Sequence, residues 1–193
     1  MSQSTRVTLL QRLRLQQDDA SWADFCRYYQ PFIRAVLMQL GSSSDEVEDL
    51  GQEVLLRSWK SLPTFEYREG QCRFRTWLGQ ICRHCLVDAR RREQAQRRRL
   101  TPDFAPPLSS DAEIEALAED EWQSYISDLA WSNIQERFTE AARQSFLLGT
   151  EGLTSVEIAA RLGIPDSSVR VNKQRITSAL YKEIVRLDND LGR

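Results

Sequence analysis

Residues Phe74–Arg92, FRTWLGQICRHCLVDARRR, form the stretch around which the rest of the chain is organised. At about 100° per residue its large apolar side chains fall in one sector, the pattern of a helix packed on a core. Those side chains are Phe74, Trp77, Leu78, Ile81 and Cys85. Arg75, Arg83 and Arg90 fall on the opposite side. The stretch therefore predicts one amphipathic helix with an apolar face and a cationic face.

Charge is divided into two blocks that follow each other along the chain. Nine arginines and two acids lie between Arg73 and Arg99, whereas nine acids and no lysine or arginine lie between Arg99 and Arg137. The net charge of −2 and the pI near 5.6 hide this division. Guanidinium groups pair with phosphate oxygens and with guanine edges, so the basic block indicates a polyanionic partner. The alternative is an arginine-rich face that contacts only water.

The length of 193 residues suits two small domains, each large enough to bury its own core. We predict a first domain over 1–95, a flexible linker over 96–118 and a second domain over 119–193. The expected fold class is all-α. No stretch approaches the roughly 20 apolar residues of a membrane span, and the first residues lack a secretory apolar segment. We therefore expect a cytoplasmic protein with no membrane partner.

The four cysteines do not form a recognisable metal site. Cys82 and Cys85 have CxxC spacing, but no second CxxC or histidine pair completes four zinc ligands. Reduced cysteines are commonly small core residues in cytoplasmic proteins. We expect no metal and no cofactor.

Helical patterns precede the central stretch. The first 18 residues carry one, and Trp22–Leu40 carries a core helix in which Pro31 predicts a kink or a break at Gln30. Ser43 and Glu46 form a capping box for a helix from Asp45 to about Trp59. Acidic residues run down one side of that helix, where they suit either the helix dipole or a cationic partner.

The segment Leu62–Gln71 is predicted to be a loop. Phe65 and Tyr67 are expected to be exposed on it, beside the cationic helix. Aromatic side chains next to cations can stack on an unpaired base. The alternative is that they pack over the core of the domain.

A helix-turn-helix motif is predicted near the end of the chain. An acidic helix over Asp111–Ser132 and a helix over Ile134–Leu148 precede it. Thr154 and Glu157 form a capping box for a short helix, Ser155–Leu162, and Gly163 ends that helix. A longer helix runs from Pro165 to about Leu187 and presents Arg170, Gln174 and Arg175, which can read base edges or hold phosphates. The alternative is a helical hairpin with no role in DNA binding.

The order of these parts resembles a bacterial sigma-70-family factor of the small extracytoplasmic-function group. Three motifs carry the resemblance, which spans about Trp22 to Leu187: VEDLGQEVLLRSW, FRTWLGQICRHCLVDARRR and GLTSVEIAARLGIPDSSVR. It implies a non-enzymatic initiation subunit with region 2 and region 4 domains. Such a subunit binds core RNA polymerase at the clamp helices of the largest subunit and at the flap region, recognises the −10 and −35 elements of promoter DNA, and helps to open the DNA.

The resemblance implies three sets of functional residues. The polymerase-binding set is Glu48, Asp49, Gln52 and Glu53. The −10 set is Thr64, Phe65, Tyr67, Arg73, Arg75, Arg83, Arg90 and Arg91. The −35 set is Ser168, Arg170, Val171, Lys173, Gln174 and Arg175.

The second domain departs from the family pattern at two places. Lys173 stands where the family usually has an apolar residue, and Ser167-Ser168 replaces the usual Gly-Thr. We expect Lys173 either to extend out to phosphate while Ile176 points inward, or to accompany a small rotation of the helix.

Two other function classes are less consistent with the sequence. An operator-binding helix-turn-helix regulator that never joins polymerase would not need the acidic helix of Glu48–Glu53. An enzyme would need a nucleophile with a base or a phosphate-binding glycine loop, and neither occurs around the single histidine, His84. An anti-sigma protein, phosphorylation and control of expression remain open as modes of regulation.

Overall fold

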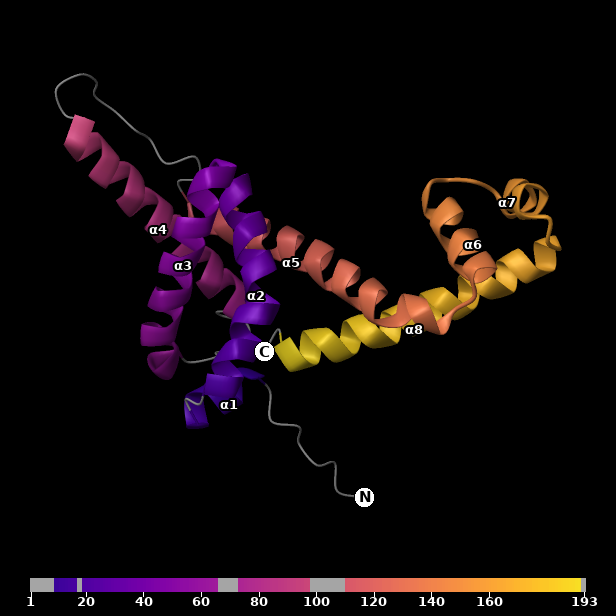
Figure 1. The fold of residues 1–193 in the computed structure, drawn as a ribbon, viewed down its shortest axis with the longest axis horizontal. Helices are drawn as coiled ribbons and strands as arrows, with labels where there is room; N and C mark the ends of the chain where they lie inside the picture. The colour runs from indigo at the N-terminus through magenta and orange to yellow at the C-terminus, as the bar shows by residue number, and fades with distance from the viewer. Residues whose placement is uncertain (1–8, 17–18, 66–72, 98–109, 192–193) are drawn as a thin grey trace. The chain divides into compact units, whose positions relative to one another are not determined.

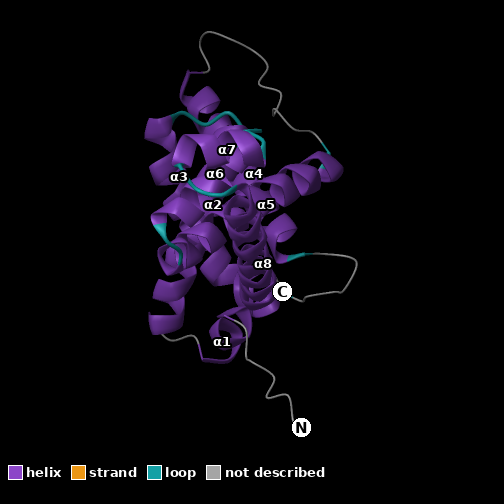
Figure 2. Ribbon diagram, turned by 90° about the vertical axis from the view of Figure 1, so that its right-hand side faces the viewer, coloured by secondary structure: helices purple, strands orange, loops and turns teal. Residues whose placement is uncertain are grey.

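The computed structural model describes residues 9–16, 19–65, 73–97 and 110–191, without the side chains of residues 14–16 and 96–97. Within these ranges the secondary structure is helical and contains no strand, as Figures 1 and 2 show. The all-α prediction is confirmed. The chain divides into one compact unit of residues 1–125 with 189–193 and a second of residues 126–188.

The helices follow one another in a simple order along the chain. They are α1 (Leu9–Gln16), α2 (Asp19–Gln39), α3 (Ser44–Ser61), η1 (Leu62–Thr64), α4 (Phe74–Arg97), α5 (Asp111–Ile134), η2 (Gln135–Arg137), α6 (Glu140–Thr150), α7 (Ser155–Leu162) and α8 (Asp166–Leu191). The predicted domain boundary at residue 119 falls inside α5, and most of the predicted linker lies outside the described residues.

The first unit is built around the mutual packing of α2, α3 and α4. Their apolar faces follow the 3.6-residue period, which places one stripe of each helix in the core. The buried stripe of α2 includes Phe25, Tyr29 and Phe32, and Phe74 of α4 meets Tyr29 edge-on at 5.1 Å between ring centroids. Leu78 and Cys85 of α4 are also fully buried, as the sequence predicted.

Helix α3 begins at the predicted capping box. The carboxylate of Glu46 accepts a hydrogen bond from the backbone N–H of Ser43 at 2.8 Å. This contact satisfies one of the backbone donors that a helix start leaves without a partner. The local sequence therefore fixes where α3 starts.

The first half of α5 packs on α4 and completes the core of the first unit. Ile114 and Ala118 are fully buried, and a Cβ placed on Gly79 of α4 would lie 3.1 Å from the Cβ of Ala118. Trp122 is 2% exposed and contacts Tyr29 and Phe32 at centroid distances of 6.0 and 5.4 Å. The acidic stretch is therefore a structural part of this unit.

Of the two expectations for Pro31, the break at Gln30 is wrong, because helix α2 continues through Pro31. The helix predicted over Ile134–Leu148 is interrupted, because α6 starts only at Glu140, where the Thr139 hydroxyl accepts from the N–H of Ala142. For Phe65 the alternative of packing over the core holds, because its ring packs on Phe74 and Trp77 and it is 7% exposed.

The second unit contains the predicted helix-turn-helix. The Thr154–Glu157 capping box starts α7, and Gly163 ends it with a φ of +64° that a residue with a side chain rarely adopts. Leu148, Ile158 and Val169 form the core that joins α6, α7 and α8. The motif is confirmed as a structural element.

We expect Trp122→Ala to destabilise the protein by about 3–5 kcal/mol, because truncation leaves a cavity beside Tyr29 and Phe32. Urea unfolding followed by far-UV circular dichroism measures the effect. Ser124→Ala, at an exposed position of the same helix, is the control and should change stability by less than about 0.5 kcal/mol. Equal stabilities of the two variants would show that α5 does not belong to the first core.

Candidate nucleic-acid interface

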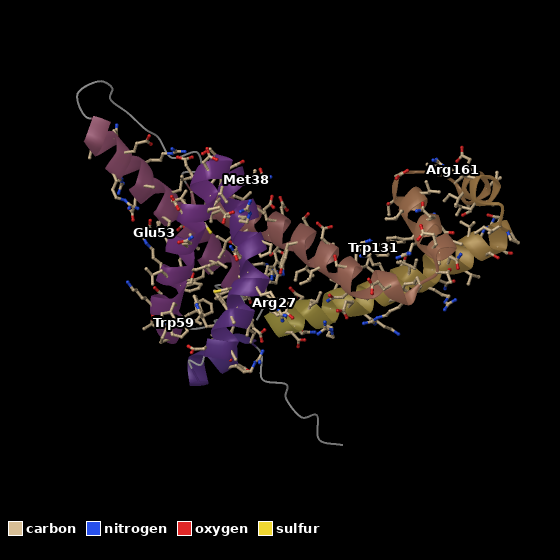
Figure 3. All side chains as sticks on the ribbon, viewed as in Figure 1. Arg27, Met38, Glu53, Trp59, Trp131 and Arg161 are labelled. Carbon is tan, nitrogen blue, oxygen red and sulfur yellow. The ribbon has the colours of Figure 1, made fainter. Side chains whose placement is uncertain are left out.

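The predicted polymerase-binding residues all lie on α3 but differ in their surroundings. Asp49 and Gln52 are exposed. Glu48 forms an ion pair with Arg34 of α2. Glu53, labelled in Figure 3, accepts from Arg57 at 2.6 Å and from Arg92 of α4 at 2.8 Å. Helix α3 thus presents exposed polar groups beside acids that already pair with arginines of the same unit.

Burial alone would raise the pKa of the Glu53 carboxyl group, but the hydrogen bonds from Arg92 and Arg57 outweigh it and lower the pKa. The pKa of Glu46 is also lowered, chiefly by the backbone hydrogen bond from Ser43 and then by Arg90. Both carboxylates are therefore charged at neutral pH and held by cations.

The first turn of α4 is fastened to α5 through one carboxylate. Arg75 donates to Glu119 from Nε at 2.6 Å and from a terminal nitrogen at 3.0 Å, a forked geometry, and Arg73 adds a contact at 2.7 Å. The Arg75 guanidinium also lies 5.7 Å from the centre of the Trp122 ring. We call this group of Arg73, Arg75, Glu119 and Trp122 the α4–α5 clasp.

The α4–α5 clasp corrects one expectation about the cationic face. Arg75 was predicted to face solvent, yet it is 7% exposed because α5 covers that side of α4. Burial alone would raise the pKa of Glu119, but the hydrogen bonds from Arg75 and Gln123 outweigh it and lower the pKa to about 2. The guanidinium of Arg75 is thus buried with a charged partner.

Further along α4, the acids of its neighbours meet its other arginines. Arg83 lies 3.3 Å from the carboxylate of Asp111 at the start of α5. Arg90 pairs with Glu46 of α3, with one contact at 3.0 Å. Arg91 is exposed, and within the described ranges its side chain has no ion pair or hydrogen bond. Most of the cationic face is therefore neutralised by the chain itself.

Of the predicted loop Leu62–Gln71, the structure describes only residues 62–65. Thr64 is exposed, and its hydroxyl donates to the carbonyl of Ser61 at 2.9 Å. Phe65 belongs to the core, so it does not offer a free ring for a base to stack on. Tyr67 lies outside the described residues.

Several of the residues predicted to contact the −35 element are exposed on helix α8. Arg170, Gln174 and Arg175 are exposed, and Val171 is 52% exposed. Arg170 pairs with Asp166 one turn earlier at 2.7 Å. An exposed face with two guanidiniums, an amide and a small apolar group has the donors and the methyl contact that major-groove recognition uses.

Lys173 and Ser168 occupy more sheltered positions on α8. Both are half-buried. The Lys173 side chain crosses α6 at Gly149, where an added Cβ would lie 2.7 Å from Cε and 2.8 Å from Nζ. Lys173 therefore lies along α6. Ile176 is fully buried, which agrees with the expectation that Ile176 points inward on this helix.

The cysteines of α4 behave as core residues. Cys82 and Cys85 are both fully buried, and burial raises the pKa of Cys85 to about 12. Among the described residues, no group of three or more histidines, cysteines or acids is arranged to hold a metal ion.

None of the described helices combines the length and apolar character needed to cross a bilayer.

Sequence reasoning missed the partners of the α4 arginines and one concave surface. The sequence analysis assigned Asp111 to the linker and Glu119 to the second domain, although a run of acids directly after a run of arginines signals that the two can pair. A cavity between α3 and α4 is lined partly by Arg57, His84 and Asp88, which were not among the predicted site residues.

Comparisons with known proteins agree with the motifs. Residues 25–96 match the family described as Sigma-70 region 2. The ECF RNA polymerase sigma factor RpoE of Cereibacter sphaeroides is 25% identical over 90% of this chain and 90% of its own. The ECF RNA polymerase sigma factor SigX of Bacillus subtilis is 26% identical over 84% of this chain and 83% of its own.

A solved structure with similarity to the chain is the sigma factor RpoE in complex with the anti-sigma factor NepR from Bartonella quintana. It is 19% identical, with coverage of 86% of this chain and 98% of that one. Its TM-score is 0.35.

Glu119→Gln should remove a pH-dependent part of the stability. The pKa of Glu119 falls from 4.5 to about 2 on folding, so its contribution is complete above about pH 4.5 and is lost as the pH falls toward 2. The stability difference between wild type and variant should shrink through that window, as measured by denaturant unfolding at stepped pH. Glu115→Gln, on the exposed side of α5, is the matched control. A difference that stays constant with pH would contradict the α4–α5 clasp.

Proposed function

This chain belongs to the sigma-70 family of RNA polymerase sigma factors, in its extracytoplasmic-function group, and from that membership we propose how its parts divide the work of initiation. The first unit, which includes the region 2 match, binds core polymerase and acts on the −10 element. The unit with the helix-turn-helix acts as region 4 and reads the −35 element. The sequence-based limits for these roles are 1–95 and 119–193, with 96–118 between them. Because Glu119 and Trp122 pack in the first unit, the proposed second domain starts at residue 126.

We assign core-polymerase binding to α3. The observation that supports it best is the exposed pair of Asp49 and Gln52 on a helix held rigidly by its capping box and its buried face. An exposed carboxylate and an exposed amide on a rigid helix suit a cationic partner surface, here the clamp helices of the largest subunit. Glu48 and Glu53 join that surface only by exchanging their present arginine partners.

We assign promoter opening to the cationic side of α4. Extruding a base costs a few kcal/mol, which phosphate contacts and a receiving surface offset without any nucleotide hydrolysis. The proposed role is therefore that of a binding subunit and not of an enzyme, acting in the cytoplasm where the bacterial polymerase works. Regulation by an anti-sigma protein stays a prediction.

Run-off transcription tests the proposal directly. Purified core polymerase is combined with genomic fragments, with and without this protein, and new start sites are mapped. Dependent initiation at sites that share an upstream and a downstream element is the expected result. DNA binding without initiation, together with failure to co-purify with core polymerase, would favour the operator-binding regulator instead.

Asp49→Arg should weaken association with core polymerase at least about tenfold, because it places a cation where the proposed partner is cationic. The protein should remain folded, since Asp49 is exposed. Analytical co-purification and run-off transcription measure the loss. Glu115→Arg, the same charge reversal at an exposed position of α5, is the control. Equal behaviour of the two variants would remove the α3 assignment.

Arg170→Ala should lower discrimination at the upstream element by about 1–3 kcal/mol if the guanidinium reads a base. Binding is measured on matched promoters that differ only in that element. Lys182→Ala, at an exposed position further along α8, should leave discrimination unchanged. An equal loss of affinity on every sequence would make Arg170 a phosphate contact only.

A further inference from the structure

One carboxylate and one guanidinium lie together at the start of α8. A terminal nitrogen of Arg170 lies 2.7 Å from a carboxylate oxygen of Asp166, and among the described residues each side chain has only the other as a partner. The acid precedes the arginine by four residues, which is the favourable order for such a pair on a helix. The Asp166 side chain is 34% exposed and that of Arg170 is 69% exposed, so the pair lies on the solvent-facing side of α8.

The Asp166 carboxylate is not what starts α8. The carbonyl of Pro165 accepts from the N–H groups of Ser168 at 2.9 Å and Val169 at 3.2 Å, so the backbone itself serves these first-turn donors. The second carboxylate oxygen of Asp166, Oδ1, is covered and has no hydrogen-bond partner among the described residues. A covered polar atom without a partner is destabilising. The contact with Arg170 is therefore the interaction that gives this carboxylate a purpose.

Packing fixes the rotation of α8 but not the conformation of the Arg170 side chain. Val169 and Ile176 are fully buried, so position 170 must face outward. An exposed arginine has many rotamers, and ordering one of them on binding lowers affinity. Asp166 restricts the choice, because it draws the guanidinium back toward the start of α8. That end of a recognition helix is the one that contacts base edges.

We propose that Asp166 is a positioning residue, which holds the Arg170 guanidinium in place to read one guanine of the upstream element. The proposal rests on the proposed function of the second unit, and it names the base that the unit selects at that position. A guanidinium has five N–H donors, and a fork onto O6 and N7 of guanine takes two of them. The others stay available to the carboxylate, so the ion pair does not have to break.

The same carboxylate works against contacts with the DNA backbone. Phosphates are negatively charged, so Asp166 repels them and gives Arg170 a competing partner. An arginine without this neighbour can turn to any nearby phosphate, which adds affinity on every sequence but carries no sequence information. Asp166 should therefore lower the affinity for unrelated DNA and raise the preference for the correct base pair.

A panel of duplexes measures the two effects separately. The full-length protein, with and without core polymerase, selects the upstream element from random-sequence duplexes, and each base pair of that element is then changed in turn. Asp166→Asn should lower the preference for guanine at one position about three- to tenfold, as expected when one flexible side chain is no longer ordered in advance. It should also raise the affinity for unrelated DNA. Arg170→Ala should lose the preference at the same position.

Two further variants separate positioning from general charge and from folding. Glu151→Gln removes an exposed acid elsewhere in the second unit, so it should raise the affinity for unrelated DNA and leave the base preference unchanged. Asp166→Glu keeps a carboxylate four residues before Arg170 and should retain the preference to within about twofold. If Asp166 only stabilised the start of α8, Asp166→Asn would weaken the preference at every position of the element, and this result would overturn the positioning role.

The double variant Asp166→Asn with Arg170→Ala shows whether the aspartate acts through the arginine. It should discriminate as well as Arg170→Ala alone, because the carboxylate then has no guanidinium to hold. A further loss in the double variant would contradict the proposal. So would a loss in Asp166→Asn at a position that Arg170→Ala leaves unchanged.

The same measurements distinguish this proposal from the proposed function. If Arg170→Ala loses one position and Asp166→Asn loses none, the positioning role fails and the reading role of Arg170 stands. If Arg170→Ala changes no position, both roles fail. If both variants lose the same position but the wild type supports no initiation with core polymerase, the proposed role in initiation fails while the Asp166–Arg170 pair stands.

Discussion

The packing of the first half of α5 onto α4 is the interaction that decides what the cationic side of α4 meets. Its apolar part buries Ile114, Ala118 and Trp122, and its polar part fastens Arg75 through two hydrogen bonds to Glu119. A buried guanidinium is tolerated only with such a partner, since leaving it unpaired costs several kcal/mol. The apolar contacts hold α5 in place, and the carboxylate makes the burial of Arg75 possible.

This constraint changes the meaning of the arginine-rich face. A face that looks uniformly cationic in the sequence is divided by its neighbours, because Glu46 and Glu53 come from α3 while Asp111 and Glu119 come from α5. Pairs near the surface contribute about 0–1 kcal/mol each, so an incoming phosphate can compete with them. The buried Arg75 is different, because its release would also expose the apolar contacts of α5.

The two units start a helix with the same local device but hold their helices with cores of different size. Both use a Ser or Thr with a Glu three residues later to start a helix, at Ser43 and at Thr154. In the second unit a small core of Leu148, Ile158 and Val169 then suffices to hold three helices. Lys173 fits there because Gly149 has no side chain, which explains how a long lysine side chain lies against α6.

The sequence by itself determined the all-α class, the caps and starts of α3 and α7, the apolar stripe of α4 and the helix-turn-helix, because each depends on residues within one or two helical turns. It did not determine which side of α4 faces solvent, that Phe65 is buried, or that α2 continues through Pro31. Those features depend on contacts between segments far apart in the chain. Arg75 and Glu119 are 44 residues apart, and only the tertiary structure brings them together. Periodicity assigns a residue to a face of its own helix, whereas the packing of the neighbouring helices decides what that face meets.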